Sequence, residues 1–126
     1  MAELTWEGNE LVLHLSRFEQ AEAIHGDLRV PASSVQRVEV LDDALGAVRG
    51  ARAPGTGFPG VVAVGTYRRR GGGKSFAVVH HNTRRGVRVI LHGTDFEELI
   101  VGCSHPEVVA DALRQGNPAA DHREAN

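Results

Sequence analysis

Residues 75–101, SFAVVHHNTRRGVRVILHGTDFEELIV, contain three runs that are rich in Val, Ile, Leu and Phe. The runs cover residues 75–81, 86–92 and 96–101, and in the second one apolar residues recur with a period of two. That period is typical of a β-strand with one buried face. The polar residues 82–85 lie between the first two runs and favour a hairpin turn, so the stretch predicts antiparallel strands.

The same kind of pattern extends toward the N-terminus. Leu11, Leu13 and Leu15 alternate with other residues, which again indicates a strand with one apolar face. Pro31 disfavours helical geometry at Val30 and favours an extended segment before it. Further strands are expected at residues 4–6, 11–15, 27–30, 35–41 (with an irregularity) and 60–67.

Two segments carry helix signals. Ser16 and Glu19 have the spacing of a capping box, which predicts a short early helix over residues 17–25. Residues 104–107, Ser-His-Pro-Glu, repeat that spacing before a predicted C-terminal helix over residues 105–115. The apolar face expected for this second helix comprises Val108, Val109, Ala112 and Leu113.

The chain has 126 residues, which fits one compact domain. We expect a single domain over residues 1–115 and a disordered C-terminal tail over residues 116–126, which are small and polar. Residues 42–60 are rich in Gly and Pro and predict a long loop inside that domain. The N-terminus lacks the apolar stretch of a signal peptide and the chain has one cysteine, so we expect a cytoplasmic protein.

Five segments of the sequence have patterns of residue types that occur together in a known family of domains. Residues 26–35, GDLRVPASSV, place a basic and an apolar residue before a proline, with serine following. Residues 53–60 are a Gly- and Pro-rich loop, and a strand continues through residues 65–67. Residues 89–102 and 104–107 have the pattern of a closing strand and a helix start. Together these segments resemble the bacterial pleckstrin-homology-like (PH-like) domain family, except that Ser-His precedes the last proline where the family usually has an acidic residue.

The resemblance covers residues 8–115 and implies the fold class. That class is mainly β (α+β): a PH-like barrel or sandwich of about seven antiparallel strands, in two near-orthogonal sheets, with the last helix plugging one end. The fold hosts lipid, peptide and protein binding, and bacterial members, many of them uncharacterised, are associated with oligomerisation. The resemblance therefore implies an interaction module and leaves the ligand open.

The charged residues are unevenly distributed along the chain. Residues 1–43 contain nine acidic and three basic residues, and residues 95–126 contain seven acidic and two basic ones. Residues 44–94 contain nine basic residues and no acidic residue. Two interpretations remain open: the basic segment forms a patch for an anionic partner, or folding places it beside the acidic segments, which neutralise it.

Two basic clusters in this middle segment are candidate binding sites. The first, in residues 68–74, surrounds a triple glycine, and the second lies in residues 84–88. Successive turns of a strand meander lie at opposite ends of a sheet, so we expect two separate exposed tips. A phenylalanine between Gly57 and Pro59 is a further candidate contact in an exposed loop. The candidate binding residues are Arg68, Arg69, Arg70, Lys74, Arg84, Arg85 and Phe58.

Three other motifs give weaker evidence of a function. Residues 55–60 match the spacing of a dinucleotide fingerprint, but a predicted loop precedes them and a predicted strand follows. His80 or His81 could share a sheet face with His92, yet nothing in the sequence supplies the further ligands that zinc needs. Cys103 has a histidine nearby and no evident orienting acid. We expect no metal, no cofactor and no enzymatic activity.

The sequence thus favours a non-enzymatic interaction module that binds a protein partner or self-associates as a homo-oligomer. The alternative is peripheral binding of anionic lipid or phosphate headgroups through basic loops 68–74 and 84–88, as a weak and salt-sensitive attraction to a membrane surface. A third interpretation is a small metal-dependent enzyme. No nucleic-acid partner is expected, because the formal net charge is -2.

Overall fold

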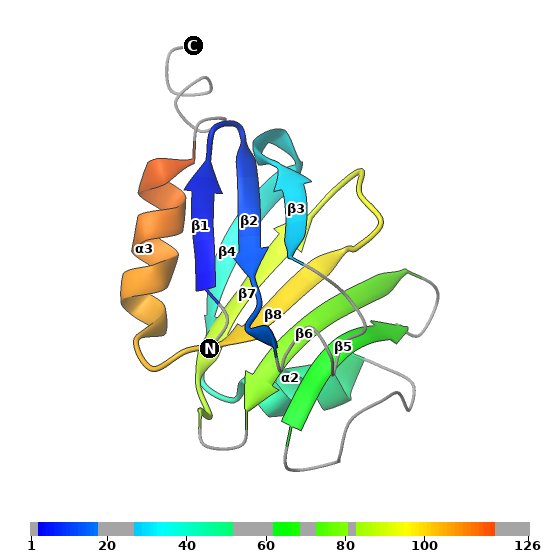
Figure 1. The fold of residues 1–126 in the computed structure, drawn as a ribbon. Coiled ribbons are helices and arrows are strands. Elements are labelled where there is room, and N and C mark those ends of the chain that lie inside the picture. The colour runs from blue at the N-terminus through cyan, green and yellow to red at the C-terminus, as the bar shows by residue number, and fades with distance from the viewer. Residues whose placement is uncertain (1–2, 18–26, 52–61, 69–72, 81–82, 118–126) are drawn as a thin grey trace.

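The computed structural model describes residues 3–17, 27–51, 62–68, 73–80 and 83–117. These residues form a three-stranded sheet, a five-stranded sheet and two α-helices (Figure 1). The described part of the chain is therefore mainly β with few helices, as expected, and its two sheets do not close into a barrel.

Three of the predictions lie outside the described residues. They are the early helix, of which only its first residue, Arg17, is described, the contact residue Phe58, and the tail beyond Asn117. These remain predictions.

The smaller sheet is antiparallel, with the strand order β1-β2-β3. A tight turn joins its first two strands, and Gly8 there has a φ of 60°, which glycine adopts without steric cost. Leu11 and Leu13 are buried on the face that packs against the larger sheet. The strands, which confirm those predicted in this region, are β1 (Glu3–Glu7), β2 (Glu10–His14) and β3 (Leu28–Pro31).

A single-turn 3-10 helix (Ala32–Ser34) leads into the larger sheet, whose strand order is β4-β7-β8-β6-β5. The register of β4 shifts between Val35 and Arg37, which confirms the irregularity expected there. The strands are β4 (Val35–Leu41), β5 (Val62–Arg68), β6 (Lys74–His80), β7 (Gly86–Leu91) and β8 (Glu98–Gly102).

The expectation of an all-antiparallel meander was wrong at one place. Strand β8 lies between β6 and β7, and it pairs parallel to β6 and antiparallel to β7. All five residues of β8 are buried, and Leu99, Ile100 and Val101 are apolar on both faces of the sheet. A strand that is apolar on both faces is stable in a central position, because there both faces are covered.

The five-stranded sheet is covered on both sides. The three-stranded sheet covers one face, and the core between them contains Phe76 and Leu99. Helix α2 (Ala44–Ala51) covers the other face, where Val48 packs with Ile100. Alternate side chains of β6 and β8 therefore enter two separate apolar clusters.

Helix α2 corrects the prediction of a loop over residues 42–60. Asp43 Oδ1 accepts a hydrogen bond from the Gly46 N–H at 3.0 Å, which caps the first turn of the helix. Ala44 is fully buried beneath that turn. The Gly- and Pro-rich composition on which the loop prediction rested belongs mainly to residues 52–60, which follow the helix.

Helix α3 (Pro106–Gly116) lies beside β1 and β4, along the side where the two sheets open (Figure 1). The helix was predicted correctly, but its capping box was not. The cap residue is His105, its side chain makes no capping hydrogen bond, and its carbonyl accepts from Val108 and Val109. Pro106 starts this helix well because its ring fixes a helical φ where no N–H partner is needed.

Candidate functional site

A groove of about 220 Å³ lies between α3, β1 and the end of β8. We name it the α3–β1 groove. Glu3 and Val108 line it together with a largely apolar set of side chains: Leu4, Val101, Cys103, Val109, Ala112 and Leu113.

The groove exists because β1 presents side chains of unequal size to α3. Trp6 packs against the C-terminal end of the helix, where its Nε1–H donates to the Leu113 carbonyl at 3.1 Å. A Cβ at Gly116 would lie only 2.8 Å from the Trp6 ring, so glycine is required for this close approach. Two residues earlier on β1, Leu4 is smaller and leaves the space beside the N-terminal half of α3 open.

Val108 is the one large hydrophobic residue that is exposed in the described part of the chain, at 67%. It was expected on the core-facing side of the helix together with Leu113. The structure instead turns Ala110 and Leu113 into the core and leaves Val108 and Ala112 on the surface. Because a helix turns once every 3.6 residues, apolar residues that are close in sequence point to different faces. The apolar residues of α3 are so closely spaced that the sequence does not show which of them face the core.

Cys103 contributes a half-buried thiol to the groove. Burial raises the pKa of this thiol, so it is protonated and weakly nucleophilic at neutral pH. Its backbone N–H donates to the Arg85 carbonyl at 3.0 Å, which fixes the start of the β8–α3 connection against the β6–β7 loop. The thiol is therefore a part of the groove wall that a chemical probe can report on.

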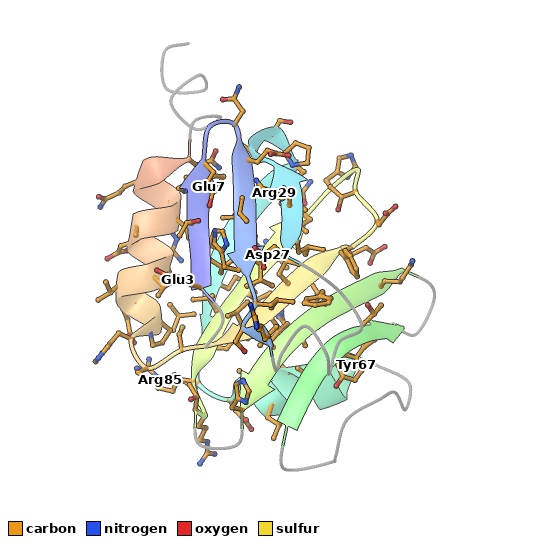
Figure 2. All side chains as sticks on the ribbon, in the orientation of Figure 1. Glu3, Glu7, Asp27, Arg29, Tyr67 and Arg85 are labelled. Atoms are coloured by element: carbon orange, nitrogen blue, oxygen red, sulfur yellow. The ribbon has the colours of Figure 1, made fainter. Side chains whose placement is uncertain are left out.

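Arg85 lies near the start of α3 (Figure 2). Its guanidinium forms two hydrogen bonds with the Glu107 carboxylate and lies 3.7 Å from Asp42. The hydrogen bonds from Arg85 lower the pKa of Glu107 and keep it ionised. Arg85 is thus ion-paired, whereas its neighbour Arg84 is exposed.

The described parts of the first basic cluster, the backbone of Arg68 and Lys74, lie at the opposite end of the larger sheet from Arg84 and Arg85, as expected for successive turns. The backbone of Arg68 pairs with Lys74, and the Lys74 side chain is exposed. The side chain of Arg68 and the whole of Arg69 and Arg70 lie outside the described structure. Within the described residues, Lys74 of the first cluster and Arg84 and Arg85 of the second therefore do not form one site.

For two arginines the structure decides between the two interpretations of the charge pattern. Arg88 lies 3.3 Å from Glu39 and 3.0 Å from Glu98. Arg85 pairs with Glu107, as described above. The acidic partners come from the acidic segments that flank the basic one, so folding neutralises these two charges.

Of the histidines considered for metal binding, His80 and His92 are not brought together, and His81 lies outside the described residues. His80 ends β6 and His92 follows β7 at the other end of the sheet, and β8 separates the two strands. Within the described ranges no group of three or more His, Cys, Asp or Glu side chains is arranged to hold a metal ion.

A cluster that the sequence analysis missed surrounds His14 on the outer face of the three-stranded sheet. The Glu7 carboxylate lies 2.5 Å from His14 Nε2, and the Asp27 carboxylate lies 3.1 Å from Nδ1. The only sequence signal was alternation: Glu7 and His14 fall between the apolar residues of adjacent predicted strands, which places both on the outer face.

Comparison with known proteins adds no identification. No family model, no curated protein and no solved structure matches this chain. In the part of the chain that the structure describes, neither helix has the length and apolar character needed to cross a membrane.

Proposed function

We propose that this protein is a non-enzymatic, PH-like interaction module that binds a segment of a partner protein in the α3–β1 groove. The observation that carries the proposal is an apolar groove beside Val108, the one large exposed hydrophobic side chain of the described residues. Apolar surface that stays exposed next to a concavity is typical of binding sites.

The charge around the groove favours a basic partner segment. Glu3 on β1 lines the groove, and Glu107 and Asp111 on α3 are exposed acidic residues next in sequence to the lining residues Val108 and Ala112. Two of them have cationic neighbours, Arg85 at Glu107 and Arg114 at 3.6 Å from Asp111, while Glu3 lies on the groove itself. A segment with an apolar side chain next to Lys or Arg would match this surface.

The backbone of β1 offers an additional contact. Glu7 and Glu10 flank the two-residue turn, so they form the closing hydrogen-bonded pair of the hairpin. Alternation along the hairpin then points the N–H and C=O of Leu4 away from β2, toward the groove. No described strand pairs with this edge of β1, so an extended segment could hydrogen-bond to Leu4.

The PH-like assignment belongs to this proposal. It is supported by the sequence segments quoted above and by the arrangement of two packed sheets with a C-terminal helix along one side. A cytoplasmic location likewise remains a prediction.

The first test is selection of short peptides from a random displayed library on the purified chain. We expect the selected peptides to carry an apolar residue flanked by Lys or Arg, and to slow maleimide modification of Cys103. Val108→Asp should abolish binding. Gln115→Asp is the matched control, because it adds the same charge to the exposed surface of α3 outside the groove.

Three outcomes would contradict the proposal. Selected peptides that bind the Val108→Asp variant equally well place the site elsewhere. A dimer of the chain that Val108→Asp dissociates makes a second copy the occupant of the groove.

The third concerns the anionic-lipid alternative, which is supported by the exposed Lys74 and Arg84. Binding to phosphatidylserine vesicles that persists at physiological salt and is lost in an Arg68, Arg69 and Arg70 to Ala variant would favour that alternative.

A further inference from the structure

His14 is the last residue of the middle strand β2, on the outer face of the three-stranded sheet. One ring nitrogen faces Glu7 of β1, and the other faces Asp27, which immediately precedes β3. The Glu7 contact is 2.5 Å and the Asp27 contact is 3.1 Å. Asp27 is itself fixed, because its second oxygen accepts the Leu15 N–H at 2.9 Å. One side chain of the middle strand therefore bridges both neighbouring segments.

The charges around this bridge are mostly negative. Thr5 Oγ1 lies 3.2 Å from the ring, and Glu3 is the cross-strand neighbour of His14. The other cation of this face in the described structure is Arg29, which lies 3.6 Å from both Glu7 and Glu10. Figure 2 shows Glu7 on β1 and Arg29 on β3 on either side of the middle strand. Loss of the charge on His14 would leave these carboxylates with a single cation.

The chemistry of imidazole makes the bridge depend on protonation. Only the imidazolium form can donate from both ring nitrogens, whereas the neutral ring donates from one and presents a lone pair to the other carboxylate. The hydrogen bond to Glu7 raises the pKa of His14 most, and the hydrogen bond to Asp27 raises it further. The hydrogen bond to His14 lowers the pKa of Glu7.

Strand β1 connects this bridge to the α3–β1 groove. The outer face of β1 carries Glu7, which His14 holds, and the inner face carries Leu4, which lines the groove, and Trp6, which docks on α3. A change in how firmly β1 is held on β2 therefore acts directly on one wall of the groove.

We propose that His14 is a proton-dependent clasp: it holds β1 in place when protonated, and its deprotonation loosens β1 and the groove wall that β1 forms. The clasp stands on the geometry of the sheet. Only its consequence for partner binding rests on the proposed function.

The first experiment follows Trp6 fluorescence in the purified chain from about pH 5.5 to about pH 9. Trp6 is the only tryptophan, so its emission reports on the docking of β1 against α3. We expect emission to shift to longer wavelength as pH rises, with a midpoint above the ordinary histidine value. His14→Gln should show the shifted emission at every pH, and Asp27→Asn should move the midpoint to lower pH.

His92→Gln is the matched control, because His92 is an exposed histidine outside the three-stranded sheet. It should behave as wild type. Emission that does not change with pH, or a transition that survives in His14→Gln, would overturn the clasp. If His14→Gln does not fold, the same test rests on the midpoint in Asp27→Asn, where no displacement would overturn it.

The second experiment measures the groove without any partner. Maleimide modifies Cys103 in wild type and in His14→Gln, and the ratio of the two rates is taken at each pH, so that the titration of the thiol itself cancels. We expect modification to be several-fold slower in wild type at low pH, and the rates to converge at high pH. A constant ratio of one would show that His14 does not control the groove.

These outcomes separate the two proposals. A pH-dependent ratio together with no selected peptide would retain the clasp and reject the groove as a binding site. Peptide binding in the groove together with a constant ratio would retain the groove as a binding site and reject the clasp.

Discussion

The two sheets both carry ionic side chains on the face turned away from their shared core, but they hold them differently. On the three-stranded sheet, Glu7 and His14 are partly exposed to solvent. On the five-stranded sheet, Glu98 is 2% exposed, accepts a hydrogen bond from Ser75 Oγ at 2.6 Å and lies 3.0 Å from Arg88 Nε. The ionic groups of the first set are in contact with water, whereas the second set is built around a carboxylate that is buried.

The second set also extends from buried Glu98 toward the exposed edge of the sheet. Arg88 lies 3.3 Å from Glu39 on β4, whose carboxylate lies 2.8 Å from the exposed Arg37 Nε. This chain of polar contacts crosses β6, β8, β7 and β4, so it fixes the neighbours of the inserted strand β8. Exposed ion pairs contribute little to stability, whereas a buried carboxylate that loses its partner is strongly destabilising. The comparison therefore separates a face that responds to pH from a face that maintains the strand order.

The largest effect is expected in the core that the two sheets share. Leu13 is 1% exposed and packs between the sheets. Leu13→Ala should lower the free energy of unfolding by roughly 2–5 kcal/mol, because it removes buried methyl groups and leaves a cavity. Urea denaturation measures this loss. A loss below about 1 kcal/mol would show that the inner face of β2 is not part of the core.

The next prediction concerns the contact between Arg88 and Glu98 on the outer face of the five-stranded sheet. Arg88→Met should cost roughly 2–3 kcal/mol in urea denaturation, below the roughly 3–5 kcal/mol of a fully buried pair, because Arg88 is 26% exposed. Combining it with Glu98→Gln should recover part of the loss, since no buried charge is then left unpaired. Arg84→Met is the control and should change stability by less than about 0.5 kcal/mol. An equal effect of both arginine substitutions would show that the contact of Arg88 with the buried Glu98 does not stabilise the sheet.

A smaller effect is expected where α2 covers the same sheet. Val48 is buried against this face. Val48→Ala should cost about 1–2 kcal/mol, the value expected for two buried methyl groups. Thermal or urea denaturation that shows no change would mean that α2 does not cover the sheet.

The smallest effect, and the one that depends on pH, is expected on the exposed face. The raised pKa of His14 means that its contribution to stability is complete below 6.5 and is lost as pH rises through the raised value. The lowered pKa of Glu7 means that its contribution is present above 4.5 and is lost on acidification. The melting temperature of wild type should therefore exceed that of His14→Gln most between these two values. A difference that is the same at all pH values would contradict the ionic origin of the bridge.

The sequence predicted the strands well because their signal is local. Alternation at Leu11, Leu13 and Leu15 located β2, and the dense apolar residues 99–101 located β8. The same local signal does not say which strand lies next to which, and so the sheet order was missed at β8. The loop prediction over α2 failed because the Gly- and Pro-rich composition of the following residues was extended to the helix.

The functional residues were less predictable. The exposed side chain of Val108 could not be told from the buried Leu113, since both belong to one apolar run in α3. The bridge from His14 to Glu7 and Asp27 joins residues that only strand pairing brings together.

By itself the sequence determined the positions of the strands, the C-terminal helix and the separation of acidic and basic segments. These features depend on residues close together in the chain, through side-chain period and local backbone preference. Only the tertiary structure decided that β8 lies between β6 and β7, that Arg85 and Arg88 are paired with acids from the flanking segments, and that β1 and α3 enclose a groove. These features depend on contacts between distant residues, whose burial and charge are set when the whole chain has packed.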